Sequence, residues 1–313
     1  MDNNKKKISI VSGSYNEEGN LQQFYDRVIK AMAKLPQYSY EIIIADNCST
    51  DGSRDILRRI ASQDKNFKVI LNSNNFGPLR SGYNAFLQAF GDAAILMGSD
   101  LQEPPELVID LVRKWEEGYQ VVVAIKNQSQ ENHLVFIVRR FYYWLLSKFS
   151  ATGSVIQNFS GFGIYDRKFM DALRKYNEPV PYFRNLVSEI GYKRTEIKFI
   201  QPQRKQGRSK HNLFTLYDVA MNGFVSSKLP LRMSTFCGLC LVVTSLFLSM
   251  GYLIFRLLHW SVFSLGTALL TIGLLFFFGM QFIFIGIVGE YVGAILTQVK
   301  NYPLAIEDEK INF

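Results

Sequence analysis

The chain of 313 residues contains only three cysteines, Cys48, Cys237 and Cys240. This number is too small for a disulfide framework, and it favours a reducing compartment. Cys237 and Cys240 form a CxxC pair, but the pair lies within a long apolar run that offers no further ligands. A buried helical face therefore explains it better than a metal or redox site. The cysteine content excludes a small disulfide-stabilised secreted protein.

Glycine-rich phosphate loops are also missing. No GxGxxG follows the first apolar run, and no GxxxxGK[ST] occurs anywhere in the sequence. Dinucleotide-binding and P-loop functions therefore lose their main support, because both hold phosphates on the backbone N–H groups of such loops. A bound diphosphate would need a metal ion or side-chain cations instead. A signal peptide is not indicated either, because no sufficiently long apolar stretch follows the basic N-terminal cluster.

Basic residues are in excess, with a formal net charge of +8 and a sequence pI of about 9.2. A basic balance fits nucleic acid, anionic lipid or a phosphorylated substrate as partner. Nucleic-acid binding has no support beyond this charge, so we expect no nucleic-acid partner.

Two long runs in the last third carry no charge at all. They span residues 234–255 and 263–289, and each exceeds the roughly 20 residues that a helix needs to cross a bilayer. Buried helices of a soluble core are the alternative, but uncharged runs of this length rarely serve that purpose. The short linker between the two runs predicts a transmembrane hairpin.

Both ends of such a hairpin lie on one side of the membrane. Lys228 and Arg232 precede the first run and Lys300 follows the second, whereas the linker offers only Arg256. The positive-inside rule then places the large N-terminal part in the cytoplasm. We expect a multi-pass protein of the cell's inner (cytoplasmic) membrane.

Upstream of these runs, short β-rich segments alternate with helical patterns. Strands are predicted at 7–15, 40–47, 67–73, 92–100 and 119–126. Such alternation predicts an α/β domain with a Rossmann-like, mainly parallel sheet and helices on both faces. The expected parts are this domain at 1–211, a juxtamembrane amphipathic helix at 212–232, two spans within 233–290 and a cytoplasmic tail at 291–313.

Ligands of such sheets bind beyond the carboxyl ends of the strands. The loops expected there are 12–18, 46–52, 72–77 and 98–103. Asp46 can accept hydrogen bonds from a base or ribose, or it can cap the next helix. Tyr15, Asn16 and Glu17 can contact a nucleotide, although Asn16 serves equally well as an N-cap. In MGSDLQEPPEL an apolar strand ends on the single acid Asp100, which suits an oxygen-ligand site for a cation or a phosphate.

Two later stretches supply cations. Residues 133–149 form a helical pattern containing Arg139, and this helix suits a bilayer surface and the domain core equally well. Residues 201–213 place Arg204, Arg208 and Lys210 around a glycine, just before the helix that leads into the membrane. A basic run is usually a solvated loop, but forked arginines and point-charge lysines are also what a lipid phosphate requires.

Taken in order, the segments SGSYNEE, ADNCSTDGS, NFG, SDLQEPPEL, YDRK and GRSKHNLF resemble the polyprenyl-phosphate glycosyltransferases. These are family 2 enzymes with the GT-A fold, and they include dolichol-phosphate mannose synthase and the bactoprenol glucosyltransferases. The similarity extends through QFIFIGIVGEYVGAILTQVKNYP and so covers nearly the whole chain. It implies an inverting hexosyltransferase that moves a sugar from a UDP-linked nucleotide-sugar donor to undecaprenyl phosphate, for modification of a cell-envelope glycan. A weakly bound divalent cation, Mg²⁺ or Mn²⁺, and a homo-tetramer are implied as well.

The resemblance also implies roles for individual residues. The donor would be bound by Tyr15, Asn16, Glu17, Asp46, Asn75, Gly77 and Ser99. Asp100 matches the last acid of the family's Asp-x-Asp triplet and Gln102 the glutamine behind it, so both would hold the metal and the diphosphate. The catalytic set would be Asp100, Gln102, Arg204 and Lys210. The lipid phosphate would be bound by Arg139, Arg204, Arg208, Ser209 and Lys210.

The sequence departs from the family pattern at several of these loops. Gly98 replaces the first acid of the triplet, Asn47 replaces an aspartate, and Pro78 follows the NFG segment. On the expected acceptor side, Gly161 and Gly163 stand in place of an acid and an arginine. These departures leave two interpretations open: an active enzyme with altered donor specificity, and a catalytically impaired, membrane-tethered nucleotide-sugar-binding relative.

The chemistry of the acceptor favours activity. A phosphate monoester has a second pKa of about 6, so the lipid phosphate is already largely dianionic at neutral pH. It therefore needs less help from a general base than a sugar hydroxyl would. Mg²⁺ commonly uses one or two carboxylates, with substrate phosphates and waters completing its coordination. A processive polysaccharide synthase is disfavoured, because the chain has no Gln-x-x-Arg-Trp motif and only two apolar spans.

Overall fold

The computed structural model describes residues 5–127, 156, 159–176, 181–202, 266–300 and 302–313, together with isolated helical positions between 236 and 258. The strands are β1 (Lys7–Ser14), β2 (Ser39–Asp46), β3 (Phe67–Asn72), β4 (Ala93–Leu96), β5 (Val121–Lys126), β6 (Phe159–Asp166), β7 (Arg194–Phe199) and β8 (Glu307–Ile311). The helices are α1 (Glu18–Met32), α2 (Ser53–Gln63), α3 (Pro78–Leu87), the 3₁₀ turn η1 (Pro105–Leu107), α4 (Val108–Glu116), α6 (Arg167–Leu173), α7 (Phe183–Ile190) and α10 (Gly266–Lys300).

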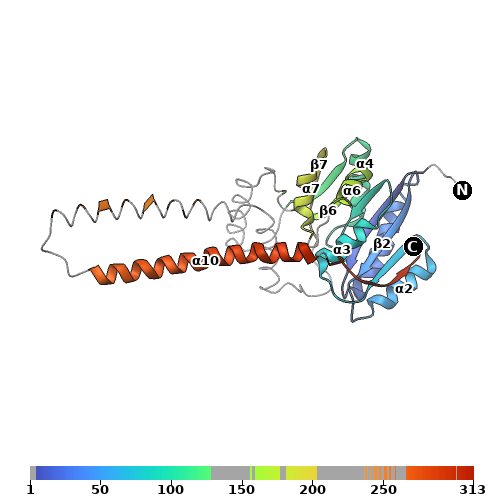
Figure 1. Cartoon of the computed structure of the whole chain (residues 1–313). Helices are drawn as coiled ribbons and strands as arrows, with labels where there is room; N and C mark the ends of the chain where they lie inside the picture. Colours follow the sequence, from blue (N-terminus) through green and yellow to red (C-terminus); the bar gives the residue numbers. More distant parts are fainter. Residues whose placement is uncertain are drawn as a thin grey trace. The chain divides into compact units, whose positions relative to one another are not determined.

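The strands form one eight-stranded sheet in the order β7-β5-β6-β4-β1-β2-β3-β8 (Figure 1). The five strands expected from the sequence are confirmed as β1 to β5. Parallel pairing joins β4, β1, β2 and β3 in the centre, and it also joins β5 to β7. However, β6 runs antiparallel to both β4 and β5, and β8 runs antiparallel to β3. The sheet is therefore mixed: its four central strands are parallel as expected, whereas β6 and β8 run antiparallel to their neighbours, which corrects the expectation of a mainly parallel sheet.

Three strands were not expected, and their sequences explain why. β6 contains Gly161 and Gly163, and glycine weakens a strand pattern. β7 reads RTEIKF and β8 reads EDEKI, and both lie at the edges of the sheet. Charged residues are a common feature of edge strands, because they discourage further strand pairing. Because of these charges, β7 and β8 lack the alternation of apolar and polar residues from which a strand is predicted.

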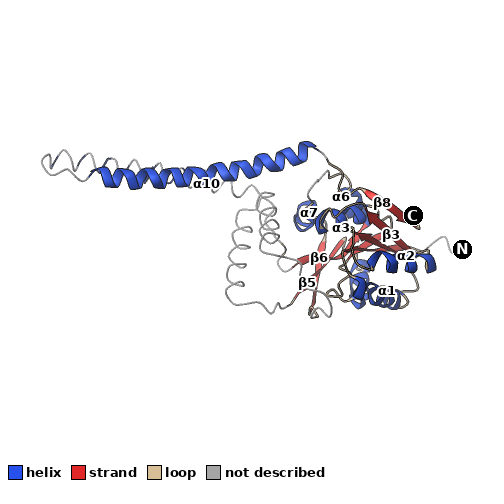
Figure 2. Cartoon of the chain, turned by 90° about the horizontal axis from the view of Figure 1, so that it is seen from below, coloured by secondary structure: helices blue, strands red, loops and turns tan. Residues whose placement is uncertain are grey.

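Helices cover both faces of the sheet, as the alternation of strands and helices predicts (Figure 2). Ile42 and Ile44 of β2 belong to the buried cluster that contains apolar residues of α1, α2 and α4. Ile43 points to the opposite face, where its cluster contains residues of α3, α6 and α7. This period-two alternation is what a strand covered on both faces requires. With both faces buried, the sheet offers its carboxyl edge to a ligand.

The chain divides into two compact units, and α10 belongs to the second of them. α10 has 35 residues and continues to Lys300, beyond the predicted end of the second span. Its stretch Met280–Lys300 has a mean hydropathy of 1.8 with none of it buried. Among the described residues it is the one helix long and apolar enough to cross a membrane. Most of the first expected span, 234–255, lies outside the described residues, so the hairpin stays a prediction.

Candidate functional site

The loops after β1 and β2 are joined by hydrogen bonds between side chains and backbone groups. Asn16 adopts a positive φ of 53°, and its N–H donates to the hydroxyl of Ser49 at 2.8 Å. The N–H of Thr50 donates to the side-chain oxygen of Asn16 at 2.8 Å, and the N–H of Glu17 donates to Ser53 at 3.0 Å. Asn16 therefore links the two loops, and the N-cap position of α1 is taken by Glu17.

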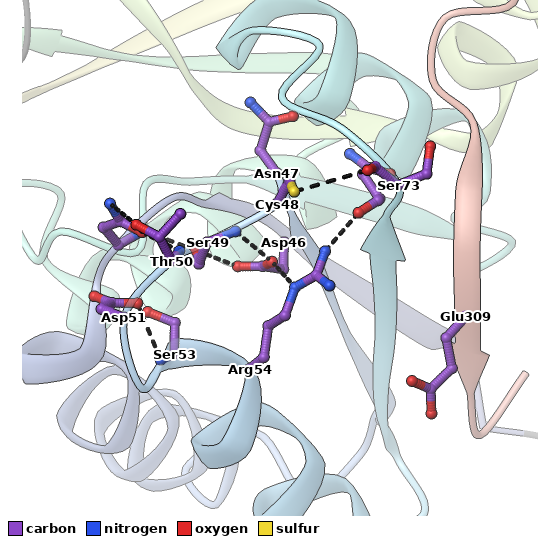
Figure 3. Close-up of polar contacts among 12 residues, drawn as sticks. Asp46, Asn47, Cys48, Ser49, Thr50, Asp51, Ser53, Arg54, Ser73 and Glu309 are labelled. Carbon is purple, nitrogen blue, oxygen red and sulfur yellow. Dashed lines mark hydrogen bonds and ion pairs between the residues drawn. The ribbon is translucent and has the colours of Figure 1, made fainter.

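Asp46 lies beneath these loops with none of its surface exposed. Its carboxylate accepts the N–H of Ser49 at 3.0 Å and also the hydroxyl of Ser49. The Nε of Arg54 lies 2.9 Å from the same carboxylate (Figure 3), and the guanidinium also donates to the carbonyl of Asn72. A buried carboxylate needs such partners, because an unpaired buried charge is very costly. Asp46 thus organises the β2–α2 loop; its contact with a donor stays a prediction.

The loop after β3 is tied to the loop after β2 by a pair of side-chain amides. The amide nitrogen of Asn47 donates to the side-chain oxygen of Asn75 at 2.7 Å. The oxygen of Asn47 accepts the N–H of Phe76 at 2.9 Å, and the oxygen of Asn75 accepts that of Gly77 at 2.9 Å. An aspartate at position 47 could accept but not donate. Asn47 therefore pairs with Asn75 in a way that an aspartate could not. The oxygen of Asn75 binds the N–H of Gly77, whose φ is 82°.

The fourth loop carries two oxygen-bearing side chains that are partly exposed. Leu101 has a positive φ of 60°, and its side chain is buried in the core. That backbone reversal leaves Asp100 and Gln102 on either side of it, both partly exposed. The N–H of Gln102 donates to Asp100 Oδ1 at 3.2 Å. The hydroxyl of Ser99 donates to the carbonyl of Gly13 at 2.9 Å and thereby fixes the loop to β1.

Glu103 is a buried acid that the sequence reasoning did not assign to the site. Only 9% of it is exposed. Its Oε2 accepts the N–H of Gly98 at 2.6 Å, and its Oε1 accepts the hydroxyl of Ser160 at 2.5 Å. Burial raises the pKa of Glu103, and these two hydrogen bonds oppose that rise. The sequence did offer one indication of its role, because Glu103 is a second acid in the 98–103 loop, where Asp100 is expected to bind a cation.

Two of the glycines that replace family residues occupy backbone positions that disfavour a side chain. Gly161 has a φ of +109°, a conformation that residues with a Cβ rarely adopt. A Cβ at Gly163 would lie 2.3 Å from the carbonyl oxygen of Val122, where no atom fits. Gly98 is different, because a Cβ there would lie 3.2 Å from Asp100 Oδ1 and 3.6 Å from Glu103 Oε2. An acid at position 98 would thus join two existing carboxylates.

The donor set of the fourth loop fits a hard divalent cation. Asp100 and Gln102 offer oxygen atoms at a partly exposed position, and Mg²⁺ prefers one or two carboxylates with waters and substrate phosphates. Within the described residues no group of three or more histidine, cysteine or acidic side chains converges on one point. A cation held here would therefore depend on the substrate for much of its coordination.

The residues predicted to bind the lipid phosphate are on two segments that follow β5 and β7 in the sequence. Arg139, Arg204, Arg208, Ser209 and Lys210 all lie outside the described residues. The residues predicted to bind the donor or the metal all lie on the four loops at the carboxyl edge of the sheet. Five of them make contacts described above that connect or shape these loops: Asn16, Asp46, Asn75, Gly77 and Ser99. The others on the same loops are Tyr15, Glu17, Asp100 and Gln102. This edge is the ligand-binding position of open α/β sheets.

A family model described as glycosyl transferase family 2 matches residues 9–174. The match begins in β1 and ends just after α6, so it includes all four loops of the site. The chain belongs to glycosyl transferase family 2, and its mixed α/β sheet is a GT-A-like fold.

Similar proteins narrow the class further. An uncharacterized glycosyltransferase of Synechocystis is 32% identical over 304 residues, covering 95% of this chain and 93% of the relative. A bactoprenol glucosyl transferase of Shigella phage SfII is 30% identical, with coverages of 95% and 96%. An undecaprenyl-phosphate 4-deoxy-4-formamido-L-arabinose transferase of Proteus mirabilis is 29% identical, with coverages of 95% and 91%. The resemblance to polyprenyl-phosphate glycosyltransferases is thereby confirmed.

Solved structures give more distant similarities. Glucosyl-3-phosphoglycerate synthase of Mycobacterium tuberculosis, in complex with phosphoglyceric acid, has a TM-score of 0.49 at 20% identity, covering 70% of this chain and 78% of that one. A mannosyltransferase of Pyrobaculum calidifontis, in complex with GDP-Man and Mn²⁺, has a TM-score of 0.45 at 14% identity, with coverages of 94% and 87%.

Proposed function

We propose that this glycosyltransferase moves a hexose from a UDP-linked sugar to undecaprenyl phosphate, with inversion, and so makes a polyprenyl-phosphate sugar for modification of a cell-envelope glycan. The observation that carries the proposal is the similarity to the bactoprenol glucosyl and undecaprenyl-phosphate formamidoarabinose transferases over 95% of the chain. That length includes the apolar helix α10 as well as the sheet domain.

The reaction needs orientation and charge stabilisation more than proton transfer. An oxygen of the lipid phosphate attacks the anomeric carbon, a new C–O bond forms, and the bond to the nucleoside diphosphate breaks on the opposite face. The electron pair leaves on the β-phosphate oxygen. Because the attacking phosphate is already largely dianionic at neutral pH, no proton has to be removed from it. The protein must therefore align two anions and stabilise the departing one.

The fourth loop supplies the groups for the departing diphosphate. Asp100 and Gln102 would hold a divalent cation, Mg²⁺ or Mn²⁺, beside the β4 end of the sheet. When bound, that cation supplies positive charge to the diphosphate leaving group. The contact of Ser99 with Gly13 and the contacts of Glu103 keep both side chains at this position.

The other three loops would hold the nucleotide and sugar. Tyr15, Asn16 and Glu17 come from the first loop, Asp46 from the second, and the Asn75–Gly77 turn from the third. Because hydrogen bonds already join these loops, the donor would meet a surface that is largely preformed, and less ordering free energy would oppose binding.

The lipid phosphate would be bound by basic groups near the membrane. We assign Arg139, Arg204, Arg208, Ser209 and Lys210 to it, and the catalytic set then consists of Asp100, Gln102, Arg204 and Lys210. The protein would sit in the cytoplasmic membrane through α10 and the preceding apolar run, with the sheet domain in the cytoplasm, and it would assemble as a homo-tetramer. A reporter enzyme that functions only in the cytoplasm should be active when it is fused to the C-terminus. Activity of a fused reporter that functions only in the periplasm would contradict this orientation.

A nucleotide-sugar binder without transferase activity is the second candidate. It is favoured by the backbone of β6, where the conformation of Gly161 and the close contact at Gly163 disfavour the acid and the arginine expected from the family. A panel of radiolabelled nucleotide-sugars, incubated with full-length protein and undecaprenyl phosphate, separates the two candidates. Transfer of label to the lipid supports the enzyme, whereas nucleotide binding without transfer from any donor supports the binder.

A further inference from the structure

We propose that residues 302–313 contribute to donor binding, because they hold the β3–α3 loop in the position in which it binds the donor. We call this segment the C-terminal strap. The inference rests on the proposed function in one respect, namely that the Asn75–Gly77 turn binds the donor. In the chain the strap directly follows α10, which ends at Lys300.

The strap first completes the sheet beside the donor loop. β8 lies beside β3 (Figure 2) and pairs with it in antiparallel fashion, so that Val69 lies opposite Ile311 and Asn72 lies opposite Glu307. Leu304 and Ile311 each pack against one of the two apolar clusters. The strap is thus built into the sheet domain, and it borders the strand that leads into the donor loop.

The hydrogen bonds continue past the end of β3 into that loop. Ser73 is the first residue after the strand, and its N–H donates to the carbonyl of Ile306 at 2.9 Å. Its hydroxyl donates to the same carbonyl at 3.1 Å. Since Asn75 follows only two residues later, the strap fixes the position from which the donor turn begins.

A second group of contacts fixes the helix at the other end of the loop. The carboxylate of Glu307 accepts hydrogen bonds from the side-chain amides of Asn84, at 2.8 Å, and Gln88. Both amides belong to α3 or its C-terminal end. The Nζ of Lys310 forms an ion pair with Oε2 of Glu307 at 2.7 Å. The strap therefore holds both β3 and α3, the two elements between which the donor loop runs.

Arg80 joins the strap to the loop itself. Its guanidinium donates to the carbonyl of Pro303 and lies 5.6 Å from the ring centre of Phe76. Phe76 in turn donates its N–H to Asn47, the partner of Asn75. A continuous set of contacts thus runs from Pro303 to the amide pair of the donor site.

The far end of the strap provides a matched control. Glu309 forms an exposed ion pair with Arg58 of α2 at 2.7 Å, and Figure 3 shows the Glu309 side chain on β8, apart from Ser73. Exposed ion pairs contribute little to stability. Removing the Glu309 charge should therefore leave the donor loop unchanged.

The test uses full-length protein in detergent and compares wild type, Glu307→Ala, Ser73→Ala and Glu309→Gln. Hydrogen exchange of the amides of residues 73–77 should accelerate in the first two variants and stay at the wild-type rate in the third. The dissociation constants for UDP and GDP, measured in parallel by calorimetry, should show the tighter nucleotide weakened roughly threefold to tenfold by Glu307→Ala, a change equivalent to about one ordinary hydrogen bond. In transfer assays, KM for the donor should rise while kcat changes little.

Unchanged exchange at residues 73–77 and unchanged nucleotide affinity in Glu307→Ala would overturn the proposal, and so would an equal effect of Glu309→Gln. Exchange of β1 amides, which should stay slow in every variant, separates loop release from general unfolding; if Glu307→Ala unfolds, the milder Ser73→Ala decides. The exchange measurement needs no lipid acceptor. A protein without transferase activity whose loop responds to these variants would refute the proposed function and leave the strap standing.

Discussion

Glu103 Oε2 lies 2.6 Å from the backbone nitrogen of Gly98, and this contact closes the loop that carries Asp100 and Gln102. The other oxygen of Glu103 reaches Ser160 at the start of β6. One buried carboxylate therefore joins the cation loop to the strand on which the family's acceptor-side residues are replaced by glycine.

Removing this carboxylate should destabilise the protein. Glu103→Ala leaves the partly buried Gly98 N–H and Ser160 hydroxyl without their acceptor, so the free energy of unfolding should fall by about 1–3 kcal/mol. Denaturant titration of the full-length protein measures the loss. Glu106→Gln is the control, because Glu106 forms an exposed bidentate pair with Arg27 and should matter by less than about 1 kcal/mol. Equal stability of the two variants would contradict the role of Glu103.

Restoring the missing acid should strengthen cation binding. The carboxylate introduced by Gly98→Asp would stand beside Asp100 and Glu103, whose oxygens lie 3.2 and 3.6 Å from the new Cβ. We expect Mn²⁺ to bind several times more tightly in the presence of UDP, as followed by electron paramagnetic resonance of the free ion. Gly98→Asn is the control of matched size and should give a smaller gain. Identical Mn²⁺ affinities in wild type and Gly98→Asp would show that the loop does not hold the cation.

Gly163 should tolerate no side chain. In Gly163→Ala the new methyl group would meet the carbonyl oxygen of Val122 at 2.3 Å, so β6 must separate from β5, and we expect a loss of about 2–4 kcal/mol. Gly82→Ala is the matched control, since a Cβ there meets nothing within 4 Å in the interior of α3. It should be neutral or stabilising by up to about 1 kcal/mol. Thermal denaturation of both variants tests the pair, and a harmless Gly163→Ala would refute the close β5–β6 approach.

The contribution of Glu307 should depend on pH. Burial raises its pKa, but hydrogen bonds from Lys310, Asn84 and Gln88 prevail and lower it below the ordinary 4.5. A carboxylate with a lowered pKa stabilises the fold above its unfolded-state pKa, and that stabilisation is lost as pH falls through the lowered value. The difference in Tm between wild type and Glu307→Gln should therefore be largest near neutral pH and shrink below about pH 4.5. A difference that stays constant from pH 7 to the acid range would rule out this linkage.

Apolar periodicity was sufficient to predict the centre of the fold. The runs around Ile8, Ile42 and Val69 are both apolar and β-branched, so β1, β2 and β3 were expected at nearly their observed positions. β8 could not be predicted in the same way, because EDEKI carries four charges and its pairing with β3 depends on residues more than 230 positions away. Local pattern contains no information about such a distant partner.

The candidate site was predictable in its location but not in its internal contacts. Strand ends placed Asp46, Asn75 and Asp100 on neighbouring loops, because parallel strands share a carboxyl edge. The sequence does not show that Asn47 pairs with Asn75, so it offers no reason for the asparagine at position 47. Likewise, the requirement for glycine at position 163 comes from the approach of a neighbouring strand, which only the three-dimensional structure contains.

The most direct test of the account is the mass of the lipid product. Full-length wild-type protein should convert undecaprenyl phosphate and a nucleotide-sugar into a lipid heavier by one hexose residue, detected by mass spectrometry of the organic extract. Asp100→Ala should yield none of this product while remaining folded. Absence of the hexosylated lipid with every donor, or the same yield from Asp100→Ala as from wild type, would contradict sugar transfer at this site.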